Sequence, residues 1–321
     1  MEMTGHSPSN RADAAGEANR PVIRGTRHAC VAGHYLAAHA GFAILEAGGN
    51  AVDAGVAAAI AEAVVQSEQV NVAGVAPMLI YLAETREVVT IAGVGPWPRA
   101  ASCEHFERHH SGRIPQGLLR SVVPAAPAAW VLALQRFGTM TFGEVAAAAI
   151  RFARDGFALH PYNAEQIQRN ADDYRKWPQN MAVYLPGGAA PAVGDVFVQK
   201  DLANTLQYLA DEERAAVGRG RDAGLRAVHH AFYRGDIAAA IAAYHREHGG
   251  WLTAQDLAAF EVELAPAARG VFRGMEVRTC GFWSQGPTLI QMLQLLEGFD
   301  LAALAHNSER YLHVLVEAVK L

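Results

Sequence analysis

The spacing of apolar residues predicts two consecutive helices near the N-terminal end of the chain. Between residues 34 and 47, apolar side chains recur at helical spacing, at Leu36, Ala40, Ala43, Ile44 and Ala47. Gly48 and Gly49 end this helix, because glycine adopts the left-handed conformation that a helix C-cap needs. Asn50 or Asp53 can then cap a second helix that runs to about residue 65. Nearly all of its residues are Ala, Val or Ile, so we predict a helix that is buried on most faces.

The next segment has the pattern of a β-hairpin. Residues 77–82 and 87–91 are rich in Val, Ile, Leu and Tyr, and the sequence Ala-Glu-Thr-Arg at 83–86 separates them. Residues 93–98 then interrupt the second strand, because the two prolines there lack ladder donors and the two glycines permit unusual dihedral angles. The pattern therefore predicts an antiparallel strand pair followed by an irregular loop.

The remainder of the chain is predicted to be rich in helices. Two of them begin with a capping box, formed by Thr141 with Glu144 and by Thr253 with Asp256. Helices are expected over residues 128–137, 141–155, 201–209, 236–245, 253–260, 288–296 and 308–321.

Three further features complete this pattern. Weak alternation over residues 271–280 predicts a strand pair that turns at Arg273-Gly274. The polar, Gly-rich stretch 214–226 is expected to be a surface loop or an insertion. Ser308 caps the last helix, and the sequence stops at Leu321 inside the apolar pattern of that helix. We therefore expect the natural chain to continue.

Composition restricts the class of protein. The 321 residues are 51% apolar and 18% charged, which is typical of one large or two ordinary globular domains, and the net charge of -5 gives no indication of a nucleic-acid partner. The polar N-terminus, residues 1–24, predicts a flexible tail without a secretory signal, and the longest apolar stretch is too short to span a membrane. We expect a cytoplasmic protein in which residues 25–321 form a single domain. The wide spacing of the three cysteines fits a reducing compartment and favours neither a disulfide framework nor a zinc site: Cys30, Cys103 and Cys280.

An ordered set of motifs resembles the gamma-glutamyltransferase family of N-terminal-nucleophile hydrolases. The resemblance implies an α+β fold, a four-layer αββα sandwich, of which this chain is the large-subunit part. It also implies a precursor that cleaves itself, so that a catalytic Thr begins a separate small subunit beyond Leu321 and no cofactor is needed. The motifs lie in the expected order over residues 31–321: EAGGNAVDAGVAAA, MLIYLAETREVVTIAG, VVPAAPAAWVLALQRFGTMTFGEVAAAAIRFARDGF, AFYRGDIAAAIAA, GGWLTAQDLAAFE and YLHVLVEAVKL.

One local departure from the family pattern concerns the substrate. The resemblance implies an Arg-Glu pair two residues past the second hairpin strand, in which the Arg binds the α-carboxylate of the substrate with its planar fork. Val94 and Gly95 stand at these positions here, and a valine cannot bind a carboxylate. We therefore expect an amidohydrolase or acylase whose substrate is not a γ-glutamyl peptide such as glutathione.

Two residues of the same loop are candidates for the substrate site. Arg99 lies five residues after Val94 and can place its guanidinium in the same pocket, although an ordinary surface ion pair is the alternative. Trp97 is held between two prolines and can form an apolar wall for an acyl group, with packing against the core as the alternative.

Residues Ser284, Gln285 and Gly286 form a second candidate. They follow a predicted strand and open a helix, where backbone N–H groups can bind an anion or a carbonyl oxygen. The resemblance implies that this loop lies near the nucleophile. Alternatively, Ser284 serves only as a helix cap.

The sequence supports few other chemistries. The grouped histidines, such as His245 and His248, have no evident third metal ligand, and no nucleophile elbow, P-loop or dinucleotide motif is present. The expected partners are a small subunit from the same precursor, a small-molecule amide or γ-glutamyl substrate and a further oligomer, with no nucleic acid and no membrane. Two alternatives stay open: a true gamma-glutamyltransferase that binds the glutamyl carboxylate through Arg99, and a non-catalytic homologue that acts as a scaffold or binding subunit.

Overall fold

The computed structural model describes residues 23–320, so the tail predicted for residues 1–24 lies almost wholly outside the described part. Helices make up most of this part, and short antiparallel strands form sheets with the orders β1-β2-β5, β3-β4 and β6-β7. The predicted α+β class is confirmed. The strands are β1 (Met78–Leu82), β2 (Glu87–Ile91), β3 (Phe157–Ala158), β4 (Val196–Phe197), β5 (Leu264–Pro266), β6 (Ala268–Phe272) and β7 (Met275–Thr279).

The first two helices form as their sequence predicts. Helix α1 (Tyr35–Glu46) and helix α2 (Ala51–Val65) are separated by a tight turn in which Gly48 has a φ of 94°. The Asn50 side chain accepts hydrogen bonds from the first turn of α2, and Asp53 closes the capping box. Most side chains of α2 are buried, which confirms the prediction of a core helix.

The predicted hairpin over residues 77–82 and 87–91 is also present. Strands β1 and β2 pair antiparallel from Met78 opposite Ile91 to Leu82 opposite Glu87, and β5 adds to the other edge of β2. Arg86 adopts a φ of 59° in the connecting turn. Because β5 belongs to the segment just before the C-terminal hairpin, the sheet brings together chain regions that are more than half the sequence apart.

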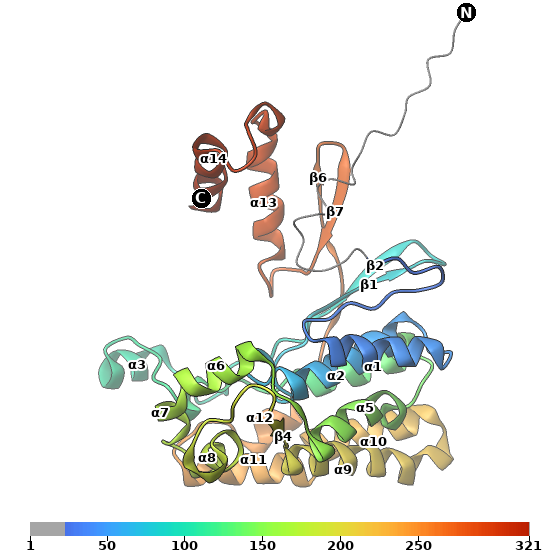
Figure 1. The fold of residues 1–321 in the computed structure, drawn as a ribbon, viewed down its shortest axis with the longest axis vertical. Helices are drawn as coiled ribbons and strands as arrows, with labels where there is room; N and C mark the ends of the chain where they lie inside the picture. Colours follow the sequence, from blue (N-terminus) through green and yellow to red (C-terminus); the bar gives the residue numbers. More distant parts are fainter. Residues whose placement is uncertain (1–22, 321) are drawn as a thin grey trace, which may run out of the picture.

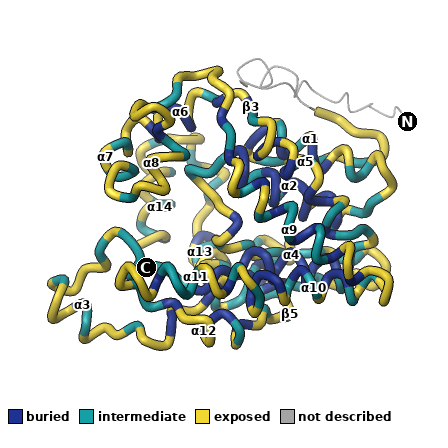
Figure 2. The backbone as a smooth tube through the Cα atoms, turned by 90° about the horizontal axis from the view of Figure 1, so that it is seen from below, coloured by how far each residue is buried: buried dark blue, intermediate teal, exposed yellow. Residues whose placement is uncertain are grey.

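A helical body packs against this sheet (Figure 1). Buried residues gather along α2, α4, α5, α9 and α10, whereas α3 and the region of α6 to α8 are mostly exposed (Figure 2). None of the helices in the described part is long and apolar enough to cross a membrane. The further helices of the body are α3 (Cys103–His110), α4 (Ala126–Phe137), α5 (Phe142–Asp155), α6 (Pro161–Arg169), α7 (Ala171–Tyr174), α8 (Pro178–Tyr184), α9 (Lys200–Ala216), α10 (Arg221–Tyr233), α11 (Asp236–Glu247) and α12 (Ala254–Ala258).

One prediction about this body was wrong. The stretch 214–226, expected to be a surface loop or insertion, instead contains the end of α9, a short 3-10 turn and the start of α10. Leu225 is fully buried, and the Arg221 guanidinium donates hydrogen bonds to the carbonyl oxygens of Leu134 in α4 and of Met140 in the connection to α5. Most residues of this stretch are exposed, so its surface position is as expected, but its conformation is helical and Arg221 joins it to the body.

The C-terminal segments stand apart from the helical body (Figure 1). Strands β6 and β7 form the predicted hairpin, whose turn has left-handed dihedral angles at Arg273 and Gly274. Helix α13 (Gly286–Glu297) packs on this hairpin and on α14 (Glu309–Lys320). The Ser308 hydroxyl accepts a hydrogen bond from the Tyr311 backbone N–H, as expected of a helix cap.

Candidate functional site

A cavity of about 640 Å³ lies where the loop after β2 meets α12 and the start of the C-terminal segments. Two of the predicted site residues, Trp97 and Arg99, line it. The remaining lining residues come from the same loop, from the segment that leads into α4, from the end of α12 and from the loop before α13: Ala92, Val94, Gly95, Pro96, Val123, Asp256, Ala259, Phe260, Glu261, Glu263 and Trp283.

The loop that carries Trp97 and Arg99 is held closely against the body. The Val123 N–H donates to the Pro96 carbonyl oxygen at 2.9 Å, and the Ala92 N–H donates to the Glu263 carbonyl oxygen at 2.9 Å. A Cβ atom on Gly95 would overlap the Val123 carbonyl group. This close approach explains why glycine stands between Val94 and the first proline of the loop.

The exposed side chains of this loop form one wall of the cavity. Val94 is 39% exposed and Trp97 is 41% exposed, and the Arg99 side chain is also exposed. Trp97 packs edge to face on Phe106 of α3, with ring centroids 6.1 Å apart. The Trp97 ring thus packs on the protein and also lines the cavity, and its role as a wall for an acyl group stays a prediction.

Asp256 fixes this wall from the opposite element. Its Oδ1 atom accepts a hydrogen bond from the Arg99 backbone N–H at 3.2 Å, and its Oδ2 atom accepts from the Thr253 N–H and hydroxyl at 3.0 and 2.6 Å. Burial acts to raise the pKa of Asp256, but these hydrogen bonds and the Arg99 charge hold the pKa below its usual value. The carboxyl group is therefore ionised at neutral pH.

The cavity carries charges of both signs. Arg99 supplies a cation on the wall, and Glu261 and Glu263 supply exposed carboxylates on the segment after α12. Trp283 adds a second indole ring. The sequence did not mark Phe260, Glu261 or Glu263 as site residues, because the tertiary fold brings them to the cavity and no local motif surrounds them.

The structure places Ser284, Gln285 and Gly286 outside the lining of this cavity, at the start of α13. The Ser284 hydroxyl donates to the Gly281 carbonyl oxygen at 3.0 Å and accepts from the Gly286 N–H at 3.1 Å. One of the helix N-terminal donors is thus already occupied by the serine. The N-cap position itself is Gln285, whose side chain accepts no capping bond, so Ser284 supports the start of the helix from one position earlier. A role for the three residues in substrate binding stays a prediction.

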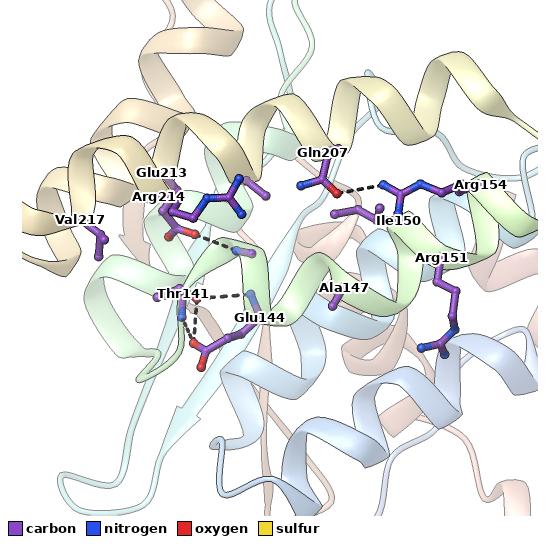
Figure 3. A pocket seen from close by; sticks show the side chains of 12 residues that line it. Thr141, Glu144, Ala147, Ile150, Arg151, Arg154, Gln207, Glu213, Arg214 and Val217 are labelled. Atoms are coloured by element: carbon purple, nitrogen blue, oxygen red, sulfur yellow. Dashed lines mark hydrogen bonds between the residues drawn. The ribbon is translucent and has the colours of Figure 1, made fainter.

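A second cavity, of about 460 Å³, lies between α5 and α9 (Figure 3). Its buried carboxylate, Glu213, accepts hydrogen bonds at 2.7 Å from the backbone N–H groups of Phe142 and Gly143 and so caps α5. Arg154 is bonded to Gln207, while Arg151 leaves α5 in a different direction (Figure 3). The polar groups of this cavity therefore hold two helices together and do not converge on a common point.

A third cavity, of about 1110 Å³, is an apolar groove between α2 and the hairpin. Among residues 23–320, no group of three or more His, Cys, Asp or Glu side chains is arranged to hold a metal ion. The cavity beside Trp97 and Arg99 thus combines two of the predicted substrate residues with further aromatic and charged side chains.

Comparison with known proteins shows the family. Residues 37–321 match the family model for gamma-glutamyltranspeptidase. The chain is 35% identical over 308 residues to the acylase ACY 1 proenzyme of Pseudomonas sp. strain SE83, covering 92% of this chain and 52% of that protein. It is 31% identical over 304 residues to the glutathione hydrolase-like YwrD proenzyme of Bacillus subtilis, covering 94% and 54%. The crystal structure of Helicobacter pylori gamma-glutamyltranspeptidase superposes with a TM-score of 0.83 at 29% identity, covering 94% of this chain and 83% of that one.

The chain belongs to the gamma-glutamyltranspeptidase family, whose members named above are enzymes. It spans about half the length of the curated relatives that it matches. The family predicted from the ordered motifs is therefore confirmed.

Proposed function

We propose that this chain is the large-subunit part of an N-terminal-nucleophile amidohydrolase, with an acylase-like substrate rather than glutathione. The observation that carries the proposal is the wall of the 640 Å³ cavity, which Val94 and Trp97 line, with Val94 at the sequence position where the family pattern implies a carboxylate-binding Arg. An apolar and aromatic wall suits an acyl group without an α-carboxylate.

The names of the relatives support an amide substrate. One relative is an acylase proenzyme and another is a glutathione hydrolase-like proenzyme. The word proenzyme and the coverage of about half of each relative support a second subunit derived from the same precursor. In this proposal, the three-stranded sheet β1-β2-β5 joins strands of that subunit in a four-layer sandwich.

The proposed chemistry is acyl transfer through a covalent intermediate. The hydroxyl of a Thr at the N-terminus of the second subunit attacks the amide carbonyl carbon, and its own α-amino group accepts the hydroxyl proton. The proton passes to the leaving amine as the C–N bond breaks. Water then attacks the resulting ester, which releases the acid and restores the Thr hydroxyl. The large subunit supplies the walls that orient the acyl group.

Intact-mass measurement of the protein from its complete reading frame tests the first step. We expect two fragments, the smaller of which begins with Thr. A single uncleaved mass, together with no turnover of any amide, would leave only the non-catalytic scaffold and would overturn the proposal.

A matched pair of substrates tests the specificity. We expect faster hydrolysis of an N-acyl anilide without an α-carboxylate than of the γ-glutamyl anilide. The Val94→Arg variant should raise kcat/KM for the γ-glutamyl anilide by about tenfold or more, because a bidentate ion pair contributes on the order of 1.5–3 kcal/mol.

The alternative substrate class is also favoured by one observation, since Arg99 lines the same cavity as Val94. A true gamma-glutamyltransferase would prefer the γ-glutamyl anilide in its natural form and would lose that preference in the Arg99→Ala variant. An acylase would keep its preferred substrate after the same change.

A further inference from the structure

We infer that Asp256 is a positioning residue of the substrate pocket, which sets substrate affinity by holding the Trp97–Arg99 wall in place. The inference rests on the proposed function, in which this cavity receives the acyl group. Asp256 is 7% exposed and lies on α12, 157 positions from Arg99 in the sequence. Its carboxylate is hydrogen-bonded to the backbone N–H of Arg99. This bond does not involve the Arg99 guanidinium, which stays available to contact a substrate.

The hydrogen bond between Asp256 and the Arg99 N–H holds the wall at a point where it has few other backbone hydrogen bonds. The loop is anchored at its beginning by the Ala92 and Pro96 hydrogen bonds. Pro96 and Pro98 flank Trp97 and have no N–H groups to donate. The Arg99 N–H is therefore the donor that ties the far end of the Pro-Trp-Pro sequence to another element, and Asp256 is its acceptor.

An aromatic contact joins the same two regions independently. Trp97 packs on Phe106, and Phe106 packs on Trp251 with ring centroids 5.2 Å apart. Trp251 lies just before the Thr253 cap of α12. The region at the start of α12 thus supports the wall in two ways. Trp251 packs on Phe106, which packs on Trp97, and the Asp256 carboxylate accepts a hydrogen bond from the Arg99 N–H.

Comparison with another capping box separates this role from helix capping. Glu144 occupies the same position in the Thr141 box of α5, where its Oε2 atom accepts from the Thr141 N–H and hydroxyl at 2.8 and 2.7 Å. Glu144 is exposed, and its carboxylate is bonded within its own box alone. Asp256 has the same capping bonds and, in addition, the bond to a substrate wall.

The test uses three variants of the full-length protein: Asp256→Ala, Asp256→Asn and Glu144→Ala. Asn keeps an oxygen that can accept from the Arg99 N–H, but its NH2 group replaces Oδ2 and can accept neither of the two capping bonds. Amide hydrogen exchange of a peptide covering residues 92–99 measures how firmly the wall is held, and it needs no substrate. Steady-state kinetics on the best amide substrate reads KM and kcat separately.

We expect faster exchange of the wall peptide in Asp256→Ala and near-natural exchange in Asp256→Asn and Glu144→Ala. In Asp256→Ala, KM should rise by about tenfold with a smaller change in kcat, as for the loss of one hydrogen bond to a charged group. Asp256→Asn should restore most of the affinity.

Two results would overturn the inference. One is unchanged exchange of the wall peptide in Asp256→Ala, and the other is a KM change of equal size in Glu144→Ala. If the natural protein turns over no amide, the proposed function fails. Amide hydrogen exchange of the wall peptide then decides by itself whether Asp256 holds the wall.

Discussion

Buried carboxylates connect distant parts of this chain at single residues. Asp53 is fully buried, closes the capping box of α2 and also accepts hydrogen bonds from the backbone and hydroxyl of Thr139 and from the Met140 N–H. Burial acts to raise the pKa of Asp53, but this set of donors holds its pKa below the usual value. Glu213 of α9 and Asp256 of α12 also join distant segments, at the start of α5 and at the cavity wall that carries Arg99, although burial raises the pKa of Glu213. Each local cap is therefore also a tertiary contact.

The Asp53→Ala variant tests how much such a contact contributes. We expect a loss of about 3 kcal/mol or more in the free energy of unfolding, because several buried N–H groups lose their acceptor. Thr141→Ala, which removes a cap without distant partners, should cost about 1 kcal/mol. Urea denaturation measures both, and equal losses would contradict a tertiary role for Asp53.

The close approach at Gly95 can be tested in the same way. A Cβ atom at Gly95 would overlap the Val123 carbonyl group, so Gly95→Ala should displace the substrate wall and destabilise the protein. Gly55 in α2 is a matched control, because a Cβ atom there has nothing within 4 Å. Gly55→Ala should be neutral or stabilising by up to about 1 kcal/mol. Similar melting temperatures for the two variants would contradict the packing argument.

At the scale of elements, two histidines cap helices and meet in one buried cluster. The Nδ1 atoms of His34 and His160 accept from the Leu36 and Asn163 N–H groups at the starts of α1 and α6. The two rings lie 5.2 Å apart. The Nε2 atom of His160 is 3.5 Å from the buried carboxylate of Glu68. A ring that accepts at Nδ1 must be neutral, so protonation removes the cap.

This arrangement predicts an acid-sensitive stability. Burial, followed by repulsion from His160, lowers the pKa of His34 to about 4, and burial also lowers the pKa of His160. Between pH 6.5 and about 4 the unfolded chain binds more protons at His34 than the folded one, so stability falls as the pH falls through this window. Burial raises the pKa of Glu62 and Glu68, which acts in the opposite direction.

The double variant His34→Asn, His160→Asn isolates the histidine contribution, because Asn caps helices without titrating. We expect the melting temperature of the natural protein to drop by several degrees more than that of the variant between pH 7 and pH 4.5. Parallel curves for the two proteins would show that the histidine caps do not control the pH dependence.

At the scale of the whole molecule, the C-terminal hairpin and helices leave apolar side chains uncovered. Phe282 is 93% exposed, and Met275 and Val319 are 62% and 61% exposed on β7 and α14. These segments stand away from the helical body (Figure 1). Apolar area of this extent on several adjacent elements is characteristic of an interface.

We therefore expect residues 1–321 produced alone to bind an apolar fluorescent dye and to self-associate at micromolar concentration. Coexpression with the second subunit proposed above should abolish both effects if that subunit covers these side chains. A monomeric, dye-free preparation of residues 1–321, checked by light scattering, would contradict this expectation.

The sequence by itself determined the elements whose signals are local. The caps at Asn50, Thr141 and Thr253, the hairpin at 77–91 and the Arg273-Gly274 turn all depend on residues within a few positions of one another. The ordered motifs also determined the family, and they placed Trp97 and Arg99 on one loop.

The tertiary structure alone decided which distant groups meet. It showed that the polar stretch 214–226 is helical and that Arg221 donates to carbonyl oxygens of Leu134 and Met140, more than 80 positions away. It brought Glu261 and Glu263 to the cavity and gave Asp256 its second partner at Arg99. Such contacts join residues tens to hundreds of positions apart, and no local pattern records them, because the free energy of a tertiary hydrogen bond depends on burial that only the folded chain creates.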